Sequence, residues 1–315
     1  MSTNPEGPLF SKVVIIGVGL IGSSLALNIR KHRLANEVVG VSRSADNRAK
    51  ILELDLADSV TDDAIAAVSG ADCVLLCTAV GAYGHLAEQI GPHLAPGCVV
   101  SDVGSTKGSV IADIAPHLPE HAHFVPAHPI AGTEQSGPTA GFESLFRDRW
   151  VILTPLPNTP REPIDKVVAL WEACGAMIDE MDPLHHDRVL AMTSHLPHLI
   201  AYTIVDTATQ LEDDLKSEVI KFSASGFRDF TRIAGSDPTM WRDVFLNNRD
   251  VVLDLLQRFQ EDLVNMQRAI RKGDGTFLFD RFTETRDIRQ SIVDARQAGQ
   301  FIPTEGNADD DEGRS

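Results

Sequence analysis

Short apolar runs alternate with helix-patterned stretches between Lys12 and about Thr154. Six runs have the length of a buried strand and are rich in β-branched residues: VVII (13–16), EVVGV (37–41), DCVLLCT (72–78), CVVSDV (98–103), HFVPA (123–127) and RWVILTPLP (149–157). Helical patterns such as Leu20–His32 separate them. Continuous apolar strands suit parallel pairing with both faces covered. The alternation therefore predicts an α/β domain with a doubly wound, mainly parallel sheet.

A glycine-rich loop, GVGLIG (17–22), follows the first run and opens the first helix. In this context the pattern predicts a Rossmann-type dinucleotide site, with the pyrophosphate on the helix N-terminus. The first glycine permits the turn, the second lets the backbone approach the ligand, and the third lets the helix pack on the strand. A glycine-rich turn without a ligand is the alternative. The residues that we expect to contact the cofactor are Gly17, Gly19, Leu20, Ile21 and Gly22.

The end of the second strand bears on the choice between NAD and NADP. An acid about twenty residues after the glycine loop would accept the ribose hydroxyls of NAD. Here the chain reads Ser42-Arg43-Ser44, with no acid before Asp46. Two hydroxyls and a guanidinium suit a 2′-phosphate, which favours NADP. Alternatively, Arg43 stacks on the adenine or is simply solvated. The sequence therefore leaves NAD as a possible cofactor.

Beyond Pro163 the pattern is helical, with few strand candidates. Helix-spaced apolar residues fill four stretches: Ile164–Cys174, Pro183–Leu211, Pro238–Lys272 and Thr276–Gln297. The two last stretches are long and carry apolar stripes that need a partner surface, so we predict a helical domain that forms a homodimer. The predicted organisation is an N-terminal extension (1–11), a dinucleotide-binding domain (12–157), a helical substrate and dimerisation domain (158–300) and a disordered acidic tail (301–315).

Charge and cysteine content narrow the class of protein. A formal net charge of −17 argues against a nucleic-acid partner, because phosphates need a basic surface. An anionic substrate then needs a dedicated cation. Four scattered cysteines do not form a disulfide framework. The N-terminus lacks the apolar core of a signal peptide, and no apolar stretch is long enough to span a bilayer. These features favour a cytoplasmic protein with no membrane partner.

Two polar loops follow the later strands. SDVGSTKGSV (101–110) leaves one strand and re-enters a helix, and HPIAGTEQSG (128–137) follows the next strand. Strand C-termini in a doubly wound sheet line the ligand crevice, so His128 is expected to face it. Oxidation of an alcohol by a nicotinamide needs a group that takes the hydroxyl proton, and histidine is suited to that role near neutral pH. A structural histidine satisfied within its own loop is the alternative.

Several blocks together resemble one family, the prephenate/arogenate (cyclohexadienyl) dehydrogenases of tyrosine biosynthesis. They occur in order as GVGLIGSS (17–24), SDVGSTKGSV (101–110), HPIAGTEQSG (128–137), TSHLPH (193–198) and FRDFTRIAGSDPTMW (227–241). The likeness covers roughly residues 12–297. The later blocks are long and specific, unlike the glycine pattern alone.

The resemblance implies NAD(P)-dependent oxidative decarboxylation of a small anionic cyclohexadienol. It implies that His128 is the catalytic base on the ring hydroxyl and that Ser105 helps orient that hydroxyl. Arg232 matches the arginine that binds a substrate carboxylate, for which its fork of donors is suited. His195, Ser236 and Trp241 match other positions that line the substrate pocket. The sequence does not separate prephenate from arogenate.

Other interpretations compete with this one. Pro197 lies between His195 and His198, and a proline inside a helix kinks it, which we expect to aim His195 into a pocket. The two histidines also lie near His185, His186 and Asp187 and invite a metal site, but the reaction needs no Lewis acid, so we expect no metal. His185 and His186 are expected on the surface at a helix start, and Lys107 is ambiguous. A β-hydroxyacid dehydrogenase would need a catalytic lysine motif that residues 182–235 lack. A non-catalytic NAD(P)-responsive binding protein is the remaining alternative.

Overall fold

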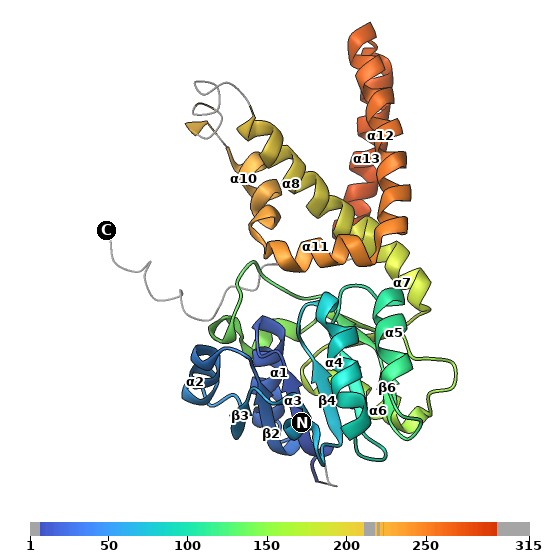
Figure 1. Cartoon of the computed structure of the whole chain (residues 1–315). Helices are drawn as coiled ribbons and strands as arrows, with labels where there is room; N and C mark the ends of the chain where they lie inside the picture. Colours follow the sequence, from blue (N-terminus) through green and yellow to red (C-terminus); the bar gives the residue numbers. More distant parts are fainter. Residues whose placement is uncertain (1–6, 211–217, 219–220, 223, 295–315) are drawn as a thin grey trace. The chain divides into compact units, whose positions relative to one another are not determined.

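The computed structural model describes residues 7–210, 218, 221–222 and 224–294 (Figure 1). The chain divides into two compact units, residues 1–255 and 256–315. Part of the predicted N-terminal extension and all of the predicted acidic tail, 301–315, lie outside the described residues. In the part of the chain that is described, no helix has the length and apolar character needed to cross a membrane.

Nine strands and twelve α-helices lie within the described residues. The strands are β1 (Phe10–Ile16), β2 (Ala35–Val41), β3 (Ser59–Thr61), β4 (Cys73–Leu76), β5 (Val99–Asp102), β6 (His123–Val125), β7 (Ala127–Pro129), β8 (Trp150–Leu153) and β9 (Met177–Glu180). The helices are α1 (Leu20–Lys31), α2 (Ala45–Glu53), α3 (Ala64–Val68), α4 (Tyr83–Ile90), α5 (Gly108–Ile114), α6 (Arg161–Ala173), α7 (Pro183–Leu190), α8 (Leu196–Thr209), α10 (Ser225–Thr231), α11 (Pro238–Asn247), α12 (Arg249–Lys272) and α13 (Gly275–Asp294), of which α3 is a single short turn.

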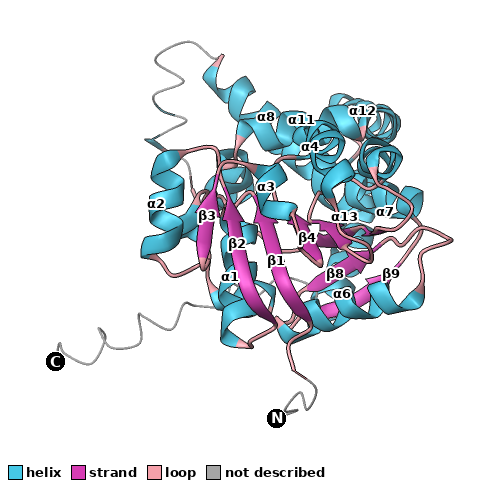
Figure 2. Ribbon diagram, turned by 60° about the horizontal axis from the view of Figure 1, so that its bottom comes forward, coloured by secondary structure: helices cyan, strands magenta, loops and turns pink. Residues whose placement is uncertain are grey.

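Six strands form one sheet in the order β3-β2-β1-β4-β5-β6, and every pair in it is parallel (Figure 2). The chain winds outward from β1 in one direction and then from β4 in the other. The predicted doubly wound parallel sheet is confirmed. Parallel strands end at the same edge, so the loops after β1, β4 and β5 meet at the point where the strand order reverses.

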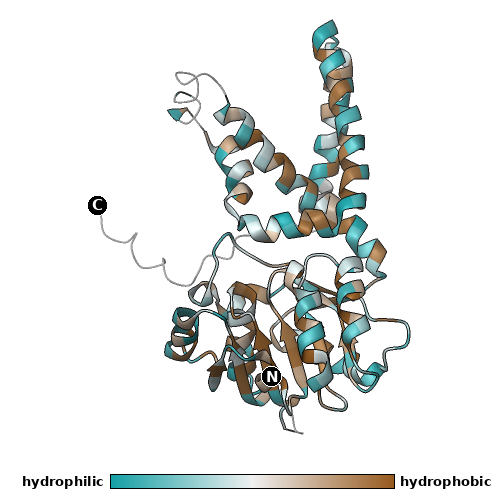
Figure 3. Cartoon of the chain, in the orientation of Figure 1, coloured by the Kyte–Doolittle hydropathy of each residue, from teal (hydrophilic) through white to brown (hydrophobic). Residues whose placement is uncertain are grey.

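Alternate residues of the central strands enter two separate cores. Val13 and Ile15 of β1 belong to the core beneath α1 and α6, whereas Val14 and Ile16 belong to the core beneath α3, α4 and α5. Both sets are almost fully buried. Figure 3 shows the strands as largely hydrophobic along their length. Burial on both faces explains why the strands read as continuous apolar runs rather than as alternating ones.

A second, three-stranded sheet corrects the sequence prediction. HFVPA was expected to be one strand, but Pro126 has no N–H for the ladder and separates β6 from β7. RWVILTPLP was expected to end the first sheet, but its strand β8 pairs with β7 antiparallel and with β9 parallel instead. β9 and β3 were missed, because each has only four or three residues and is partly exposed. The three-stranded sheet thus includes β9, beyond residue 157, where the sequence analysis placed the end of the first domain.

The helices that follow β9 include an irregular turn. Ala191–His195, between α7 and α8, forms a wide π-helical turn, and Pro197 occupies the first turn of α8. The sequence predicted that Pro197 would distort the helix here. In residues 256–294, the rest of α12 and α13 form a helical hairpin joined at Gly273, whose φ of 68° closes the end of α12.

Candidate active site

The glycine loop after β1 has the shape that the sequence predicts. Gly17 has a φ of 95°, and a Cβ there would lie 2.8 Å from the backbone nitrogen of Thr78, at the end of β4. A Cβ on Gly22 would overlap the Gly17 carbonyl. By contrast, a Cβ on Gly19 would meet no atom within 4 Å, and no side chain caps the N-terminus of α1. Open space at Gly19 beside an uncapped helix N-terminus is a cradle for an anion.

The loop after β2 is organised by a residue that the sequence did not point to. Arg48 donates to the carbonyls of Ser42 and Arg43 at 2.8 and 2.9 Å and pairs with Asp62 at 3.2 Å. The Ser44 hydroxyl caps α2 by accepting from the Asn47 N–H. Of the predicted hydroxyl–guanidinium–hydroxyl group, Ser44 is therefore engaged in the fold, whereas the Arg43 side chain is exposed.

A fully buried ion pair lies at the end of β5. Lys107 Nζ is 2.6 Å from Asp102 Oδ2 and donates to the Ala127 carbonyl at 2.7 Å, next to His128. Burial raises the pKa of Asp102 and lowers that of Lys107, in each case against the attraction between the two groups. Lys107, ambiguous from the sequence, therefore ties the end of β5 to β7.

Asp187 of α7 joins the start of α5. Its two carboxylate oxygens accept the backbone N–H groups of Lys107 and Gly108 at 2.7 and 2.8 Å. Burial raises the pKa of Asp187, but hydrogen bonds from His186 and these two N–H groups outweigh it and hold the pKa below its usual value. Asp187 is accordingly an anion at the centre of the site.

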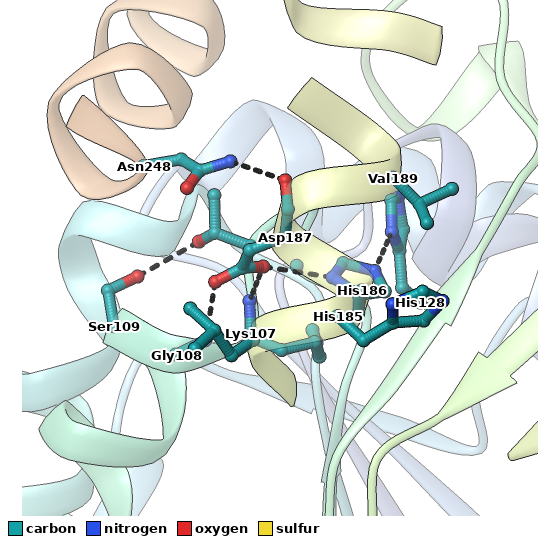
Figure 4. A network of polar contacts seen from close by, with 12 residues as sticks. Lys107, Gly108, Ser109, His128, His185, His186, Asp187, Val189 and Asn248 are labelled. Atoms are coloured by element: carbon teal, nitrogen blue, oxygen red, sulfur yellow. Dashed lines mark hydrogen bonds and ion pairs between the residues drawn. The ribbon is translucent and has the colours of Figure 1, made fainter. Parts of the chain in front are cut away.

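His128 belongs to a chain of hydrogen bonds that ends at this anion (Figure 4). Its Nδ1 lies 2.8 Å from His186 Nε2, and His186 Nδ1 lies 2.9 Å from Asp187 Oδ1. His186 is fully buried, so its predicted place on the surface is wrong. His185, one residue earlier, is exposed as expected.

His128 and His186, the two histidines linked by this hydrogen bond, are both held neutral. Burial lowers the pKa of His128 well below its usual value, and His186, Lys107 and His195 lower it further. Burial also lowers the pKa of His186, although Asp187 acts in the opposite direction. A neutral imidazole has a lone pair that accepts a proton or a hydrogen bond, as a base must.

The π-helical turn places His195 in the same interior. His195 is fully buried; its Nδ1 lies 3.2 Å from Asn248 Nδ2, which also donates to the Asp187 carbonyl. Burial lowers the pKa of His195 to about 4. Its Nε2 has no hydrogen-bond partner among the described residues. Such turns are rare and frequently lie at functional sites.

An aromatic group adjoins His195. The Trp241 ring stacks on His198 with centroids 3.6 Å apart and meets His195 edge-on at 6.1 Å. Its Nε1, like His195 Nε2, is buried without a hydrogen-bond partner among the described residues. Two unused buried donors are expensive unless a ligand accepts from them.

The loop that begins at His128 also contacts the predicted carboxylate-binding residue. Arg232 Nη1 lies 3.4 Å from Glu134 Oε2, and the Arg232 side chain is 60% exposed. Arg232 is near enough to His198 to lower its pKa, after the larger effect of burial. The Ser236 hydroxyl donates to the Ile233 carbonyl in its own turn, and Ser105 is half-buried in the loop after β5.

The far end of the same loop is attached to the nucleotide helix. The Phe142 N–H donates to the Ser24 hydroxyl at 3.1 Å, and the Asn28 amide donates to the Glu143 carbonyl at 3.0 Å. The glycine loop and the segment that starts at His128 are therefore positioned by one helix, α1.

Sequence reasoning missed three buried polar residues: His186, Asp187 and Asn248. The only signal for the first two was their place just after Asp182–Pro183, a helix start, which solvated residues share. Asn248 lies where α11 ends, and nothing in the pattern distinguishes it from a helix-terminal asparagine. Only their contacts across the fold show their role.

Two family models match the chain: "Prephenate dehydrogenase, nucleotide-binding domain" over residues 25–180 and "Prephenate dehydrogenase, dimerization domain" over residues 182–284. Among relatives, a cyclohexadienyl dehydrogenase of Zymomonas mobilis is 41% identical over 284 residues, or 90% of this chain and 97% of the relative. A prephenate dehydrogenase of Bacillus subtilis is 33% identical over 91% of this chain and 77% of its own length.

Solved structures agree. A prephenate dehydrogenase from A. aeolicus, in complex with hydroxyphenyl propionate and NAD+, aligns with a TM-score of 0.83 and 32% identity over 90% of this chain and 98% of that chain. An arogenate dehydrogenase from Synechocystis aligns with a TM-score of 0.74 and 28% identity over 89% and 99%.

Proposed function

The chain belongs to the prephenate dehydrogenase family, and from that membership we propose that it oxidatively decarboxylates prephenate, arogenate or both with a nicotinamide cofactor. One observation of this structure carries the proposal to named residues: a neutral, buried histidine, His128, lies on a loop that is attached to the helix of the glycine cradle. Family membership sets aside the β-hydroxyacid dehydrogenase alternative.

The glycine loop fits a dinucleotide. The cradle that a Cβ on Gly19 would fill is open, and the helix N-terminus beside it is uncapped. In this proposal the backbone of Gly19, Leu20 and Ile21 holds the pyrophosphate, while Gly17 and Gly22 supply the tight turn. The bound nicotinamide supplies the hydride acceptor for the reaction.

His128 Nε2 is the proposed base. As hydride leaves the ring carbon that bears the hydroxyl, positive charge develops on that carbon and its oxygen. Nε2 accepts the hydroxyl proton in a hydrogen bond and shares this charge, a contribution of about 10²–10⁴-fold. The bond to the leaving carboxylate breaks, carbon dioxide departs, and the electron pair completes the aromatic ring. The phenol oxygen holds its proton in the product. Ser105 is proposed to orient the same hydroxyl.

Arg232 is proposed to bind a carboxylate of the substrate. Its side chain is exposed, and its ion pair with Glu134 is long, at 3.4 Å, so the guanidinium is open to a ligand. Because the chain has a net charge of −17, a dianionic or zwitterionic substrate needs a dedicated cation of this kind. His195 and Trp241 present unused buried donors and are proposed to line the pocket. Ser236, whose hydroxyl is used in its own turn, is proposed to shape that wall.

The cofactor preference is proposed to be NADP. Arg43 is exposed beside Ser42, and no acid follows β2 before Asp46. An arginine fork suits a 2′-phosphate. Arg43→Ala is expected to lower kcat/KM with NADP by tenfold or more and to leave that with NAD within about twofold, because only NADP carries the phosphate.

The test is a two-by-two kinetic comparison of prephenate and arogenate, each with NAD and NADP, in the wild type and in His128→Asn. The proposal expects turnover of at least one substrate and a loss of about 10²–10⁴-fold in kcat on replacing His128. Cofactor binding without turnover of either substrate would instead support a non-catalytic binding protein.

A further inference from the structure

The hydrogen-bond chain from Asp187 to His128 allows one arrangement of protons. Asp187 accepts two backbone N–H groups, so it is an acceptor toward His186 as well. His186 Nδ1 must therefore carry a hydrogen. A neutral His186 then has its lone pair on Nε2, which faces His128 Nδ1 at 2.8 Å.

The same reasoning continues to His128. Since His186 Nε2 accepts, His128 Nδ1 must be the donor, and the lone pair of a neutral His128 lies on Nε2. We propose that His186 and Asp187 are positioning residues that fix this tautomer of His128 and stabilise the positive charge that it gains in the reaction. This inference rests on the proposed role of His128.

Among the described groups around His128, only the hydrogen bonds through His186 to Asp187 link its ring to an anion. The charged and titratable groups that act on it are His186, Lys107 and His195. The Lys107 ammonium bonds to Asp102 and to the Ala127 carbonyl, and His195 Nδ1 to Asn248. The Asp187 carboxylate is linked to the His128 ring by two successive hydrogen bonds, through the His186 ring (Figure 4). An imidazole oriented by a carboxylate-linked partner is a general device for activating a base.

The test uses substitutions of different reach at position 186. A glutamine amide oxygen can occupy the place of Nε2 and still accept from His128 Nδ1. The shorter asparagine cannot reach it, and leucine offers no acceptor. The expected result is that His186→Gln retains kcat within about tenfold of the wild type, whereas His186→Asn and His186→Leu lose about 10²-fold or more. His185→Leu, the exposed neighbour on the same helix, serves as the matched control and should behave as the wild type.

A double-mutant cycle separates positioning from general damage. If His186 acts only through His128, His186→Asn costs nothing further in kcat once His128 is asparagine. Cofactor affinity, measured by fluorescence titration, should stay within about twofold in every variant, because the glycine cradle does not contact His186. The pH profile of kcat should shift in His186→Asn, since the charged form of His128 loses its link to Asp187.

A direct readout is the ¹⁵N spectrum of the histidine-labelled protein, assigned through His128→Asn. A protonated Nδ1 and an unprotonated Nε2 on His128 would support the proposal. The reverse tautomer, equal loss in His186→Gln and His186→Asn, or a full further loss in the His128→Asn background would overturn it. An inactive wild type would contradict the proposed function instead, and the ¹⁵N spectrum would still decide the tautomer.

Discussion

Three glycines of one loop differ in what the fold demands at each position. Gly17 needs a left-handed backbone, and Gly22 has no room for a Cβ against the Gly17 carbonyl. Gly19 has ordinary φ and free space, so nothing in the protein itself demands a glycine there. The free space at Gly19 is open to the pyrophosphate that we propose there.

Gly19→Ala is therefore expected to leave stability unchanged and to weaken cofactor binding by roughly tenfold or more, about 1.4 kcal/mol. The measurement pairs a thermal melt with a cofactor titration. Gly226→Ala, at another glycine with open space, is the control and should change neither quantity. A Gly19→Ala protein with normal cofactor affinity would contradict the proposed cradle.

Prediction from sequence at this scale depended on local signals. The glycine loop was predictable because its spacing follows a strand and opens a helix, and the structure has that geometry. His186 was not, because a histidine near a helix start has the same local pattern whether it faces solvent or β7. Its burial depends on contacts that are remote in sequence, such as the one with His128, 58 positions earlier.

At the scale of elements, the segment from α7 to α8 gathers buried histidines. His186 and His195 are fully buried, and the π-helical turn allows both to face the interior. Pro197, which has no N–H, explains why a regular helix does not continue through this point. The proline predicted the distortion and an inward-facing His195, but nothing in the sequence predicted the burial of His186.

Acid is expected to unfold the protein through these histidines. The pKa of His195 is about 4 in the fold and near 6.5 when unfolded, so the unfolded state binds more protons between these values. Stability is present above pH 6.5 and is lost as the pH falls toward 4. Between pH 7 and pH 5 His195 alone accounts for roughly 2 kcal/mol. Urea unfolding at the two pH values should show a smaller loss in His195→Gln, and an unchanged loss in His185→Gln.

The loop between β5 and α5 depends on the Asp102–Lys107 pair. Lys107→Met leaves a buried carboxyl without its partner and is expected to lower the free energy of unfolding by about 3–5 kcal/mol. Adding Asp102→Asn should recover part of that loss, because the uncompensated charge is then gone. Urea unfolding of both single variants and the double variant measures this coupling, and additive losses would refute it.

Strand prediction failed where strands are short and exposed. β1, β2, β4 and β5 were predictable because burial on both faces requires continuous apolar sequence. β9 has one half-buried residue in four, so its composition does not distinguish it from a loop. The place of β8 was also unpredictable, since nothing local tells a strand which sheet it will join.

At the scale of the whole molecule, residues 256–294 leave large apolar side chains on the surface. Leu263 and Ile270 of α12 and Phe279 and Phe282 of α13 are each more than half exposed. Several large apolar side chains exposed on two consecutive helices are typical of an interaction surface. We propose that a second copy of the chain covers them, in keeping with the dimerization-domain match over residues 182–284.

Ile270→Asp is expected to weaken this association by tenfold or more, because a buried carboxylate would face apolar side chains of the second copy. Sedimentation velocity over a dilution series measures it. Arg258→Glu, at an exposed position on the same helix, is the control. A wild type that sediments as a monomer at all concentrations would remove the proposal.

The hydrogen bonds of Asp187 to α5 and of Asn248 to α7 limit how α7 can move. Only Met181 and Asp182 separate β9 from α7, which would suit a hinge. The Asp187 carboxylate accepts two N–H groups at the first turn of α5 and so fixes α7 to it. The Asn248 amide, just after α11, donates to the Asp187 carbonyl and fixes α7 a second time. We therefore expect α5, α7 and the end of α11 to move as one piece, so that the short link after β9 does not act as a hinge.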